Sequence, residues 1–145
     1  MFTSRHDLRK AGIACAVVVL LGFSLMGPAS ASGGGPGDDS LRGTSARDDL
    51  RGGAGDDTLS GRGNKDILRG NSGADIVRGN RGFDDVRGGP GKDVLRGGLG
   101  NDNLQGGRGN DTLYGGKGDD ILDGGPGFDI CRGGDGNNRT VNCEG

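Results

Sequence analysis

A nine-residue period governs residues 34–132 of the chain. The phrase G-G-x-G-x-D-x-U-x, in which U is a large apolar residue, occurs eleven times in succession without insertion or deletion, as in GGAGDDTLS (52–60) and GGRGNDTLY (106–114). Position one is glycine and position six is aspartate in every block. A fixed period predicts a stack of similar units, each of which buries its apolar residue against its neighbours.

Each block divides into an expected turn and an expected strand. Glycine allows positive φ angles and close backbone approach, so we expect positions one to six to form a turn with inward carbonyl groups. Positions seven to nine are expected to form a short strand, in which only position eight points to the inner face. The predicted core consists of the position-eight side chains: Leu41, Leu50, Leu59, Leu68, Val77, Val86, Leu95, Leu104, Leu113, Leu122 and Cys131.

This phrase resembles the hemolysin-type calcium-binding repeat, also called the RTX nonapeptide repeat. The resemblance covers nearly all of the chain after residue 31. It implies an all-β fold, a parallel β-roll (β-solenoid) with two repeats per coil, in which calcium ions lie between turns stacked on the same side. It also implies that the aspartate of one block shares an ion with that of the second block along, and that at most about ten ions are bound.

The position-six aspartates are the expected calcium ligands. Calcium takes six to eight oxygens from carboxylates and carbonyls, which a glycine-rich turn ending in aspartate supplies. Asx turns are the alternative for any single block, but eleven aspartates in phase favour metal binding. The expected ligands are Asp39, Asp57, Asp75, Asp84, Asp93, Asp102, Asp111, Asp120 and Asp129, with weaker sites at Asp48 and Asp66.

The two weaker sites are expected because their blocks depart from the glycine pattern and bring in a cation. GTSARD at 43–48 places Arg47 beside the ligand, and GRGNKD at 61–66 places Lys65 there. A positive charge in this position repels a metal ion. We therefore expect well-formed sites from about Gly88 onward.

Residues 1–31 are typical of a secretory signal peptide, with a basic start, an apolar run at 11–26 and a small-residue cleavage site at 29–31. An uncleaved membrane anchor is the alternative, but the apolar run is shorter than the roughly 20 residues of a spanning helix. We expect cleavage, an extracellular location and no stable membrane insertion afterwards. The expected organisation is a signal peptide (1–31), a β-roll (32–132) and a C-terminal cap (133–145).

The apolar content after residue 31 is low for a chain that folds unaided. Leu, Ile, Val and Phe number 19 there, about 17%, below the level of about 20% that accompanies disorder. Ordering the backbone costs about 1–2 kcal/mol per residue, and one buried side chain per block does not offset that. We therefore expect the chain to be disordered without calcium and folded with it.

Two cysteines follow the signal sequence, Cys131 in the last complete block and Cys143 in the cap. In an exported chain a disulfide between them is the inference, and it would pin the cap. A reactive pair is the alternative. It needs an activating basic environment, for which Arg132 and Arg139 are the nearest candidates.

Arginine is frequent at position nine, and we expect it to point outward on both faces of the roll. Once the signal and the eleven ligand aspartates are set aside, 15 basic and 8 acidic residues remain. A solvated, aggregation-resistant surface is one interpretation. Calcium-dependent adhesion to an anionic cell-surface polymer is the other. The position-nine arginines are Arg42, Arg51, Arg69, Arg78, Arg87, Arg96 and Arg132.

Two further function classes are disfavoured. Specific nucleic-acid recognition lacks an aromatic platform, because only Phe83, Tyr114 and Phe128 are aromatic after residue 31. Enzymatic activity is not expected, because the one histidine, His6, lies in the signal sequence and the aspartates are assigned to the repeat. Two carboxylates suffice for a glycosidase, but a thin roll offers no large pocket. A secreted structural or binding module is the prediction.

Overall fold

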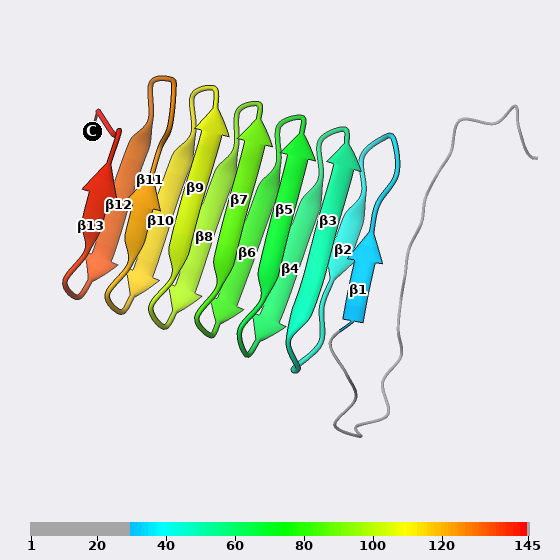
Figure 1. Cartoon of the computed structure of the whole chain (residues 1–145), viewed down its shortest axis with the longest axis horizontal. Coiled ribbons are helices and arrows are strands. Elements are labelled where there is room, and N and C mark those ends of the chain that lie inside the picture. Colours follow the sequence, from blue (N-terminus) through cyan, green and yellow to red (C-terminus); the bar gives the residue numbers. More distant parts are fainter. Residues whose placement is uncertain (1–29, 145) are drawn as a thin grey trace, which may run out of the picture.

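A computed structural model describes residues 30–144, which form thirteen strands and a flat stack of coils (Figure 1). The predicted signal peptide lies outside the described residues except for its last two, which belong to the first strand. The strands are β1 (Ser30–Gly33), β2 (Ser40–Arg42), β3 (Asp48–Ala54), β4 (Thr58–Gly63), β5 (Ile67–Ser72), β6 (Ile76–Arg81), β7 (Asp85–Pro90), β8 (Val94–Leu99), β9 (Asn103–Arg108), β10 (Thr112–Lys117), β11 (Ile121–Asp123), β12 (Ile130–Asp135) and β13 (Arg139–Val141).

Consecutive strands alternate between two sheets. The odd-numbered strands form a seven-stranded sheet in the order β1-β3-β5-β7-β9-β11-β13, and the even-numbered strands form a six-stranded sheet from β2 to β12. All pairings are parallel, and each residue lies beside the residue 18 positions later, as Leu50 does beside Leu68. Two nine-residue blocks therefore make one coil, which confirms the predicted parallel β-roll.

Most strands are longer than the three residues expected from the sequence, and only β2, β11 and β13 have that length. β4, for example, covers positions seven to nine of one block and positions one to three of the next. The expectation of a six-residue turn was therefore wrong, because the first half of the glycine phrase continues the parallel ladder. In the blocks with the longer strands, only positions four to six remain to reverse the chain between the two sheets.

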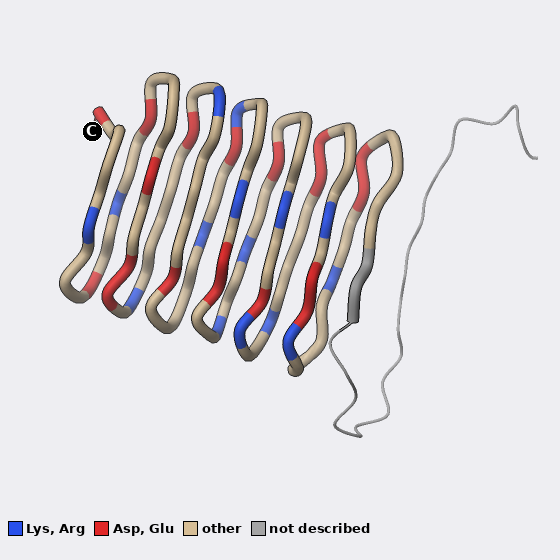
Figure 2. The backbone as a smooth tube through the Cα atoms, in the orientation of Figure 1, with Lys and Arg blue, Asp and Glu red and all other residues tan. Residues whose placement is uncertain are grey.

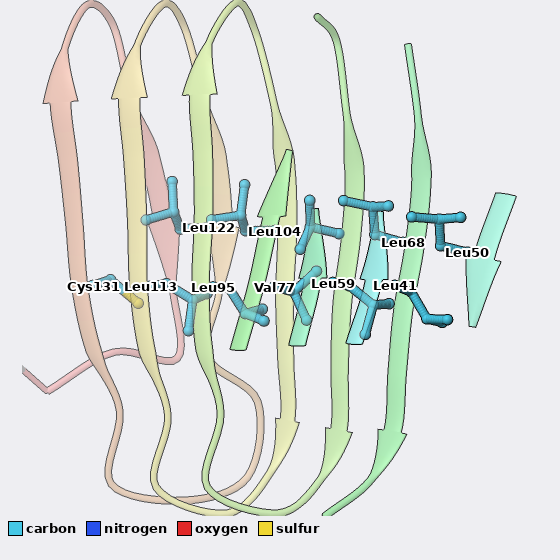
Figure 3. Packing of buried hydrophobic residues seen from close by; sticks show 11 residues of the cluster. Leu41, Leu50, Leu59, Leu68, Val77, Leu95, Leu104, Leu113, Leu122 and Cys131 are labelled. Carbon is cyan, nitrogen blue, oxygen red and sulfur yellow. The ribbon is translucent and has the colours of Figure 1, made fainter. Parts of the chain in front are cut away.

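The core is thin, because each block contributes a single apolar side chain to it. Every position-eight residue is buried, from Leu41 to Cys131, and none is more than 8% exposed. Figure 3 shows these side chains as two facing rows, one from each sheet. The predicted core is confirmed in full, and Cys143 packs against its C-terminal end.

A disulfide closes that end of the core. Cys131 and Cys143 are bonded, with their Cα atoms 5.8 Å apart. The predicted pairing is therefore confirmed. A crosslink that encloses a loop of this length stabilises the folded chain by about 3 kcal/mol in the chain-entropy model.

Glycine at position one is required by space. A Cβ atom on Gly106 would lie 2.5 Å from Oδ2 of Asp111 and 2.5 Å from the carbonyl oxygen of Gly124. Both distances are too short for a carbon atom. The aspartate side chain of each block therefore occupies the volume that any side chain at position one would need.

The glycines at positions two and four serve a different purpose, since they adopt positive φ angles, as at Gly107 (116°) and Gly109 (133°). Asn71 and Asn80 accept the same conformation at position two, with φ of 79° and 82°. Arg62 also stands there, with φ of 93°. A non-glycine residue in this region costs about 1–3 kcal/mol, so the block that contains Arg62 is strained as well as cationic.

The steric role of position one predicts a difference between two glycine substitutions. Gly106→Ala should destabilise the fold by roughly 1–3 kcal/mol, because an extra carbon must displace a buried carboxylate. Gly35→Ala is the control, because a Cβ atom there has nothing within 4 Å. Urea unfolding in saturating calcium measures both. Equal stabilities for the two variants would contradict the steric account.

Candidate metal centre

The position-six aspartates form two ladders along the edges of the stack. Nine pairs of aspartates 18 residues apart are joined in this way. In each pair, the backbone N–H of the earlier aspartate donates to Oδ1 of the later one, at 2.7–2.8 Å. All eleven side chains are buried, and none is more than 7% exposed. One ladder contains Asp39, Asp57, Asp75, Asp93, Asp111 and Asp129, and the other contains Asp48, Asp66, Asp84, Asp102 and Asp120.

The second carboxylate oxygen lacks a hydrogen-bond partner in nine of these residues. In the first block, Oδ2 of Asp39 accepts the N–H of Gly35 at 2.7 Å, and in the second, Oδ2 of Asp48 accepts that of Thr44 at 2.6 Å. From the third block onward no such bond is made. The buried, unpartnered Oδ2 atoms belong to Asp57, Asp66, Asp75, Asp84, Asp93, Asp102, Asp111, Asp120 and Asp129.

Eight of the nine unpartnered oxygens lie near a position that a backbone carbonyl from the next coil also approaches. The position that a Cβ atom on Gly106 would take is 2.5 Å from Oδ2 of Asp111 and 2.5 Å from the carbonyl oxygen of Gly124. The same pairing recurs at the position-one glycines of the other blocks except Gly70, where the three nearest atoms all belong to Asp75. Two oxygens in a buried place repel each other unless a proton or a cation lies with them.

This donor set fits a calcium ion. Within residues 30–144, no three Asp, Glu, His or Cys side chains come close enough to hold a metal ion by themselves. An ion at this edge must therefore combine carboxylate oxygens with backbone carbonyls. Calcium, a hard cation that binds flexible sets of carboxylate and carbonyl oxygens, suits that mixture.

Burial changes the acidity of these carboxyl groups. Desolvation raises the pKa of Asp66, Asp93 and Asp102 to about 7, although the backbone N–H donated to each one opposes the rise. Neighbouring carboxylates in the same ladder raise the pKa further. Desolvation also raises the pKa in a further set of the ladder: Asp57, Asp75, Asp84, Asp111 and Asp120.

The two sites expected to be weaker differ from each other. Asp48 has a partner for Oδ2, whereas Oδ2 of Asp66 is unpartnered like those of the later blocks. Arg47 and Lys65 are exposed beside them, as their place in the turns requires. Asp39, expected to be an ordinary ligand, also has its Oδ2 occupied by an N–H of its own block. The graded strength of the sites stays a prediction.

A further set of hydrogen bonds between coils runs along position five, to which the sequence analysis assigned no role. Oδ1 of an Asp or Asn at position five accepts the backbone N–H of the residue 18 positions later, which is position five of the next coil, at 2.7–3.0 Å. The sequence signal was present, since position five is rich in Asp and Asn. The acceptors are Asp38, Asp56, Asn101, Asn110 and Asp119.

The outer faces of the two sheets differ in charge (Figure 2). On the seven-stranded sheet, Asp49 forms ion pairs with both Arg51 and Arg69, at 3.1 and 2.9 Å, and Asp85 pairs with Arg87 at 3.3 Å. These position-seven carboxylates offset the repulsion between arginines on adjacent strands. The charge of this face is therefore largely neutralised.

The six-stranded sheet has no acidic residue at positions seven and nine between β2 and β12. Arg78 and Arg96 lie side by side on β6 and β8. Arg96 and Arg132 flank the ring of Tyr114, at 5.2 and 5.7 Å from its centroid. Arginines therefore point outward on both sheets, as expected, but only this face lacks compensating carboxylates within those positions.

The raised pKa values predict that acid favours the calcium-free fold. Between the ordinary value of 3.8 and the folded value of about 7, such a carboxyl group binds more protons in the folded chain. Its contribution to stability is fully present below about pH 4 and is lost as the pH rises through about 7.

Far-UV circular dichroism in calcium-free buffer should therefore show more β-structure at about pH 5 than at about pH 8. The control is the same pair of spectra in saturating calcium, where protons compete with the metal and acid should not increase the β-signal. Calcium-free spectra that coincide, or that show more β-structure at the higher pH, would disagree with the pKa shifts.

A family model described as the RTX calcium-binding nonapeptide repeat (4 copies) matches residues 33–68, 69–104 and 96–131. The matched segments contain all eleven aspartates of the two ladders. The comparisons with curated proteins and with solved structures gave no match.

Proposed function

The chain belongs to the RTX calcium-binding nonapeptide repeat family, and from that premise we propose that it is a secreted calcium-binding module that folds when several ions bind. The observation that carries the proposal is the set of nine buried, unpartnered Oδ2 atoms. A buried charge without a partner strongly opposes folding. A bound cation removes that penalty, so binding and folding are coupled.

The residues of each block divide the work of holding an ion. The carboxylate at position six supplies Oδ2, and the carbonyl group of position one in the next coil supplies a second oxygen. Glycine at position one leaves the space in which these oxygens meet. The N–H to Oδ1 bond fixes the orientation of the carboxylate, and when bound, calcium supplies the positive charge that this oxygen-only surrounding lacks.

We propose an upper limit on the number of bound ions. Two columns of stacked turns give the expected upper limit of about ten. The unpartnered oxygens begin in the third block, which supports stronger binding from there onward. Asp39 and Asp48 lie at the open end, where the protein's own N–H groups satisfy their second oxygens.

We propose a structural or binding role without catalysis. Two open surface hollows in the described region hold about 290 Å³ each, near the lower limit for a ligand pocket. Neither lining contains a histidine or a cysteine. Secretion rests on the signal-like pattern of residues 1–31. No helix in the described part of the chain is long and apolar enough to cross a membrane.

Asp111→Asn tests the ligand role. Asparagine keeps an Oδ1 acceptor for the N–H of Asp93 but replaces the charged Oδ2 by a neutral amide group that faces the carbonyl of Gly124. We expect the calcium concentration at the folding midpoint to rise roughly 10-fold, with no loss of stability in calcium-free buffer. Circular dichroism during a calcium titration measures the midpoint.

Asp119→Asn is the matched control for this experiment. It removes the same charge one block later but belongs to the exposed position-five set of hydrogen bonds, where an amide oxygen still accepts the N–H of Asn137. Its midpoint should equal that of the wild type. Equal shifts of the midpoint in the two variants would show that the shift depends only on net charge. A wild-type spectrum that does not change with calcium would contradict the proposed function itself.

A second role is adhesion to an anionic cell-surface polymer, and the uncompensated face of the six-stranded sheet favours it. Strands are about 4.8 Å apart, so Arg78 and Arg96 present a closely spaced pair of charges. Tyr114 and its flanking arginines extend the row towards β12. A linear polyanion laid across the strands would meet several cations and no carboxylate at positions seven and nine.

Two double variants with equal charge separate this face from the other. Arg78→Gln with Arg96→Gln should lower the salt concentration that elutes the calcium-loaded protein from a sulfated polysaccharide column, because two contacts are lost. Arg51→Gln with Arg87→Gln should elute near the wild type, because those arginines are paired with Asp49 and Asp85. Equal elution of both variants, or no retention of the wild type at low salt, would exclude this role.

A further inference from the structure

The C-terminal segment after β13 imitates one more coil of the roll, in a shortened form. Asn142 lies 18 residues after Gly124, and its carbonyl oxygen approaches Gly124 as the carbonyl of Gly124 approaches Gly106. The N–H of Gly124 donates to the carbonyl of Val141 at 3.0 Å, which repeats the bond from Gly34 to Arg51. The chain therefore keeps the repeat register as far as Asn142.

Glu144 then replaces two positions of the repeat at once. Its backbone N–H donates to the carbonyl of Asp129 at 2.8 Å, a bond that a position-seven N–H makes elsewhere, as from Ile130 to Asp111. Its Oε2 accepts the N–H of Asp129 at 2.6 Å, where the preceding coils use Oδ1 of a position-six aspartate. The longer glutamate side chain lets Glu144 take the place of a position-six aspartate although it comes three positions earlier than the 18-residue register requires.

The oxygen groups of the repeated centre therefore recur here, beyond the last repeat. Asp129 is fully buried and its Oδ2 has no hydrogen-bond partner. A Cβ atom on Gly124 would lie 2.7 Å from this Oδ2 atom and closer still to the carbonyl oxygen of Asn142. The disulfide between Cys131 and Cys143 holds the residue between Asn142 and Glu144 against the core.

We propose that Glu144, which lies outside the nonapeptide phrase, is a calcium ligand. It completes the last site of its column together with Asp129 and the carbonyl of Asn142, and the disulfide holds this segment in place. The inference rests on the proposed calcium binding of the repeats. Because Glu144 is exposed, water completes the coordination of this ion, and the site is more open than those inside the stack.

The other ladder ends in a way that shows what the hydrogen bond alone requires. There the N–H of Asp120 donates to the amide Oδ1 of Asn138 at 2.9 Å, so a neutral group suffices as the terminal acceptor. The nitrogen of the same amide donates to the carbonyl of Gly134. The hydrogen bond of the ladder therefore does not require the negative charge of Glu144, and this charge is available to a cation.

Glu144→Gln separates these two roles, because glutamine keeps an oxygen that can accept the N–H of Asp129 and loses only the charge. Calcium binding to the full-length protein is counted by equilibrium dialysis with radioactive calcium. The variant should bind one ion fewer than the wild type, or bind its weakest ion roughly 10-fold less tightly. Asp135→Asn is the control, since Asp135 is an exposed acid at the same end of the roll outside both ladders. It should bind the wild-type number.

The outcomes are distinct. A wild type that binds no calcium would remove the proposed function. If the wild type binds calcium and the Glu144→Gln variant binds the same number of ions with the same affinity, only the ligand role of Glu144 would be removed. Equal losses in the Glu144→Gln and Asp135→Asn variants would also overturn it.

A second measurement covers the case in which Glu144→Gln does not fold. Glu144 is the only glutamate in the sequence, so wild-type protein labelled with carboxyl-¹³C glutamate has a single labelled side-chain carboxylate. Calcium ligation should change the separation of its infrared stretching bands, measured in calcium-loaded and calcium-free protein. Bands that keep the separation of a free ionised carboxylate at calcium saturation would overturn the site.

Discussion

The bond from each position-six N–H to the carboxylate of the next coil sets the character of this fold. It joins coils 18 residues apart at about the same short distance throughout both ladders. Because it uses only Oδ1, it also fixes Oδ2 in a buried place where no protein donor reaches it from the third block onward. The contact that orders the stack therefore creates the electrostatic penalty that a cation removes.

The rest of the molecule is consistent with that dependence. The apolar core is a double row of single side chains, which leaves little hydrophobic stabilisation to offset the ordering of a glycine-rich backbone. The position-five set adds inter-coil bonds only where Asp or Asn is present. At the C-terminal end the disulfide, Asn138 and Glu144 finish the two columns in different ways.

Much of this architecture was predictable because a strict period restricts the fold so strongly. The position-eight core and the Cys131–Cys143 disulfide follow from spacing and compartment chemistry, and both are confirmed. The parallel roll with two repeats per coil came through the family resemblance. By contrast, the steric reason for glycine at position one depends on a carboxylate of the same block and a carbonyl from another coil. Strand length was missed for a related reason, since the ladder that extends each strand joins distant blocks.

Other features required knowledge of which blocks are neighbours. Asp49 and Arg69, for example, come together only because alternate blocks form adjacent strands of one sheet. Glu144 was not recognised because it lies outside the phrase, and its role depends on a shortened loop that no repeat pattern contains. Residues that act between coils are therefore the ones that a one-dimensional repeat hides.

A crystal structure of the calcium-loaded protein, with anomalous scattering recorded at a long wavelength, tests the central claim most directly. The account predicts two columns of calcium peaks along the edges of the roll, in contact with the Oδ2 atoms of Asp57 to Asp129 that have no protein partner. Peaks confined to exposed carboxylates, or ladders whose Oδ2 atoms adjoin no ion in a folded chain, would contradict it.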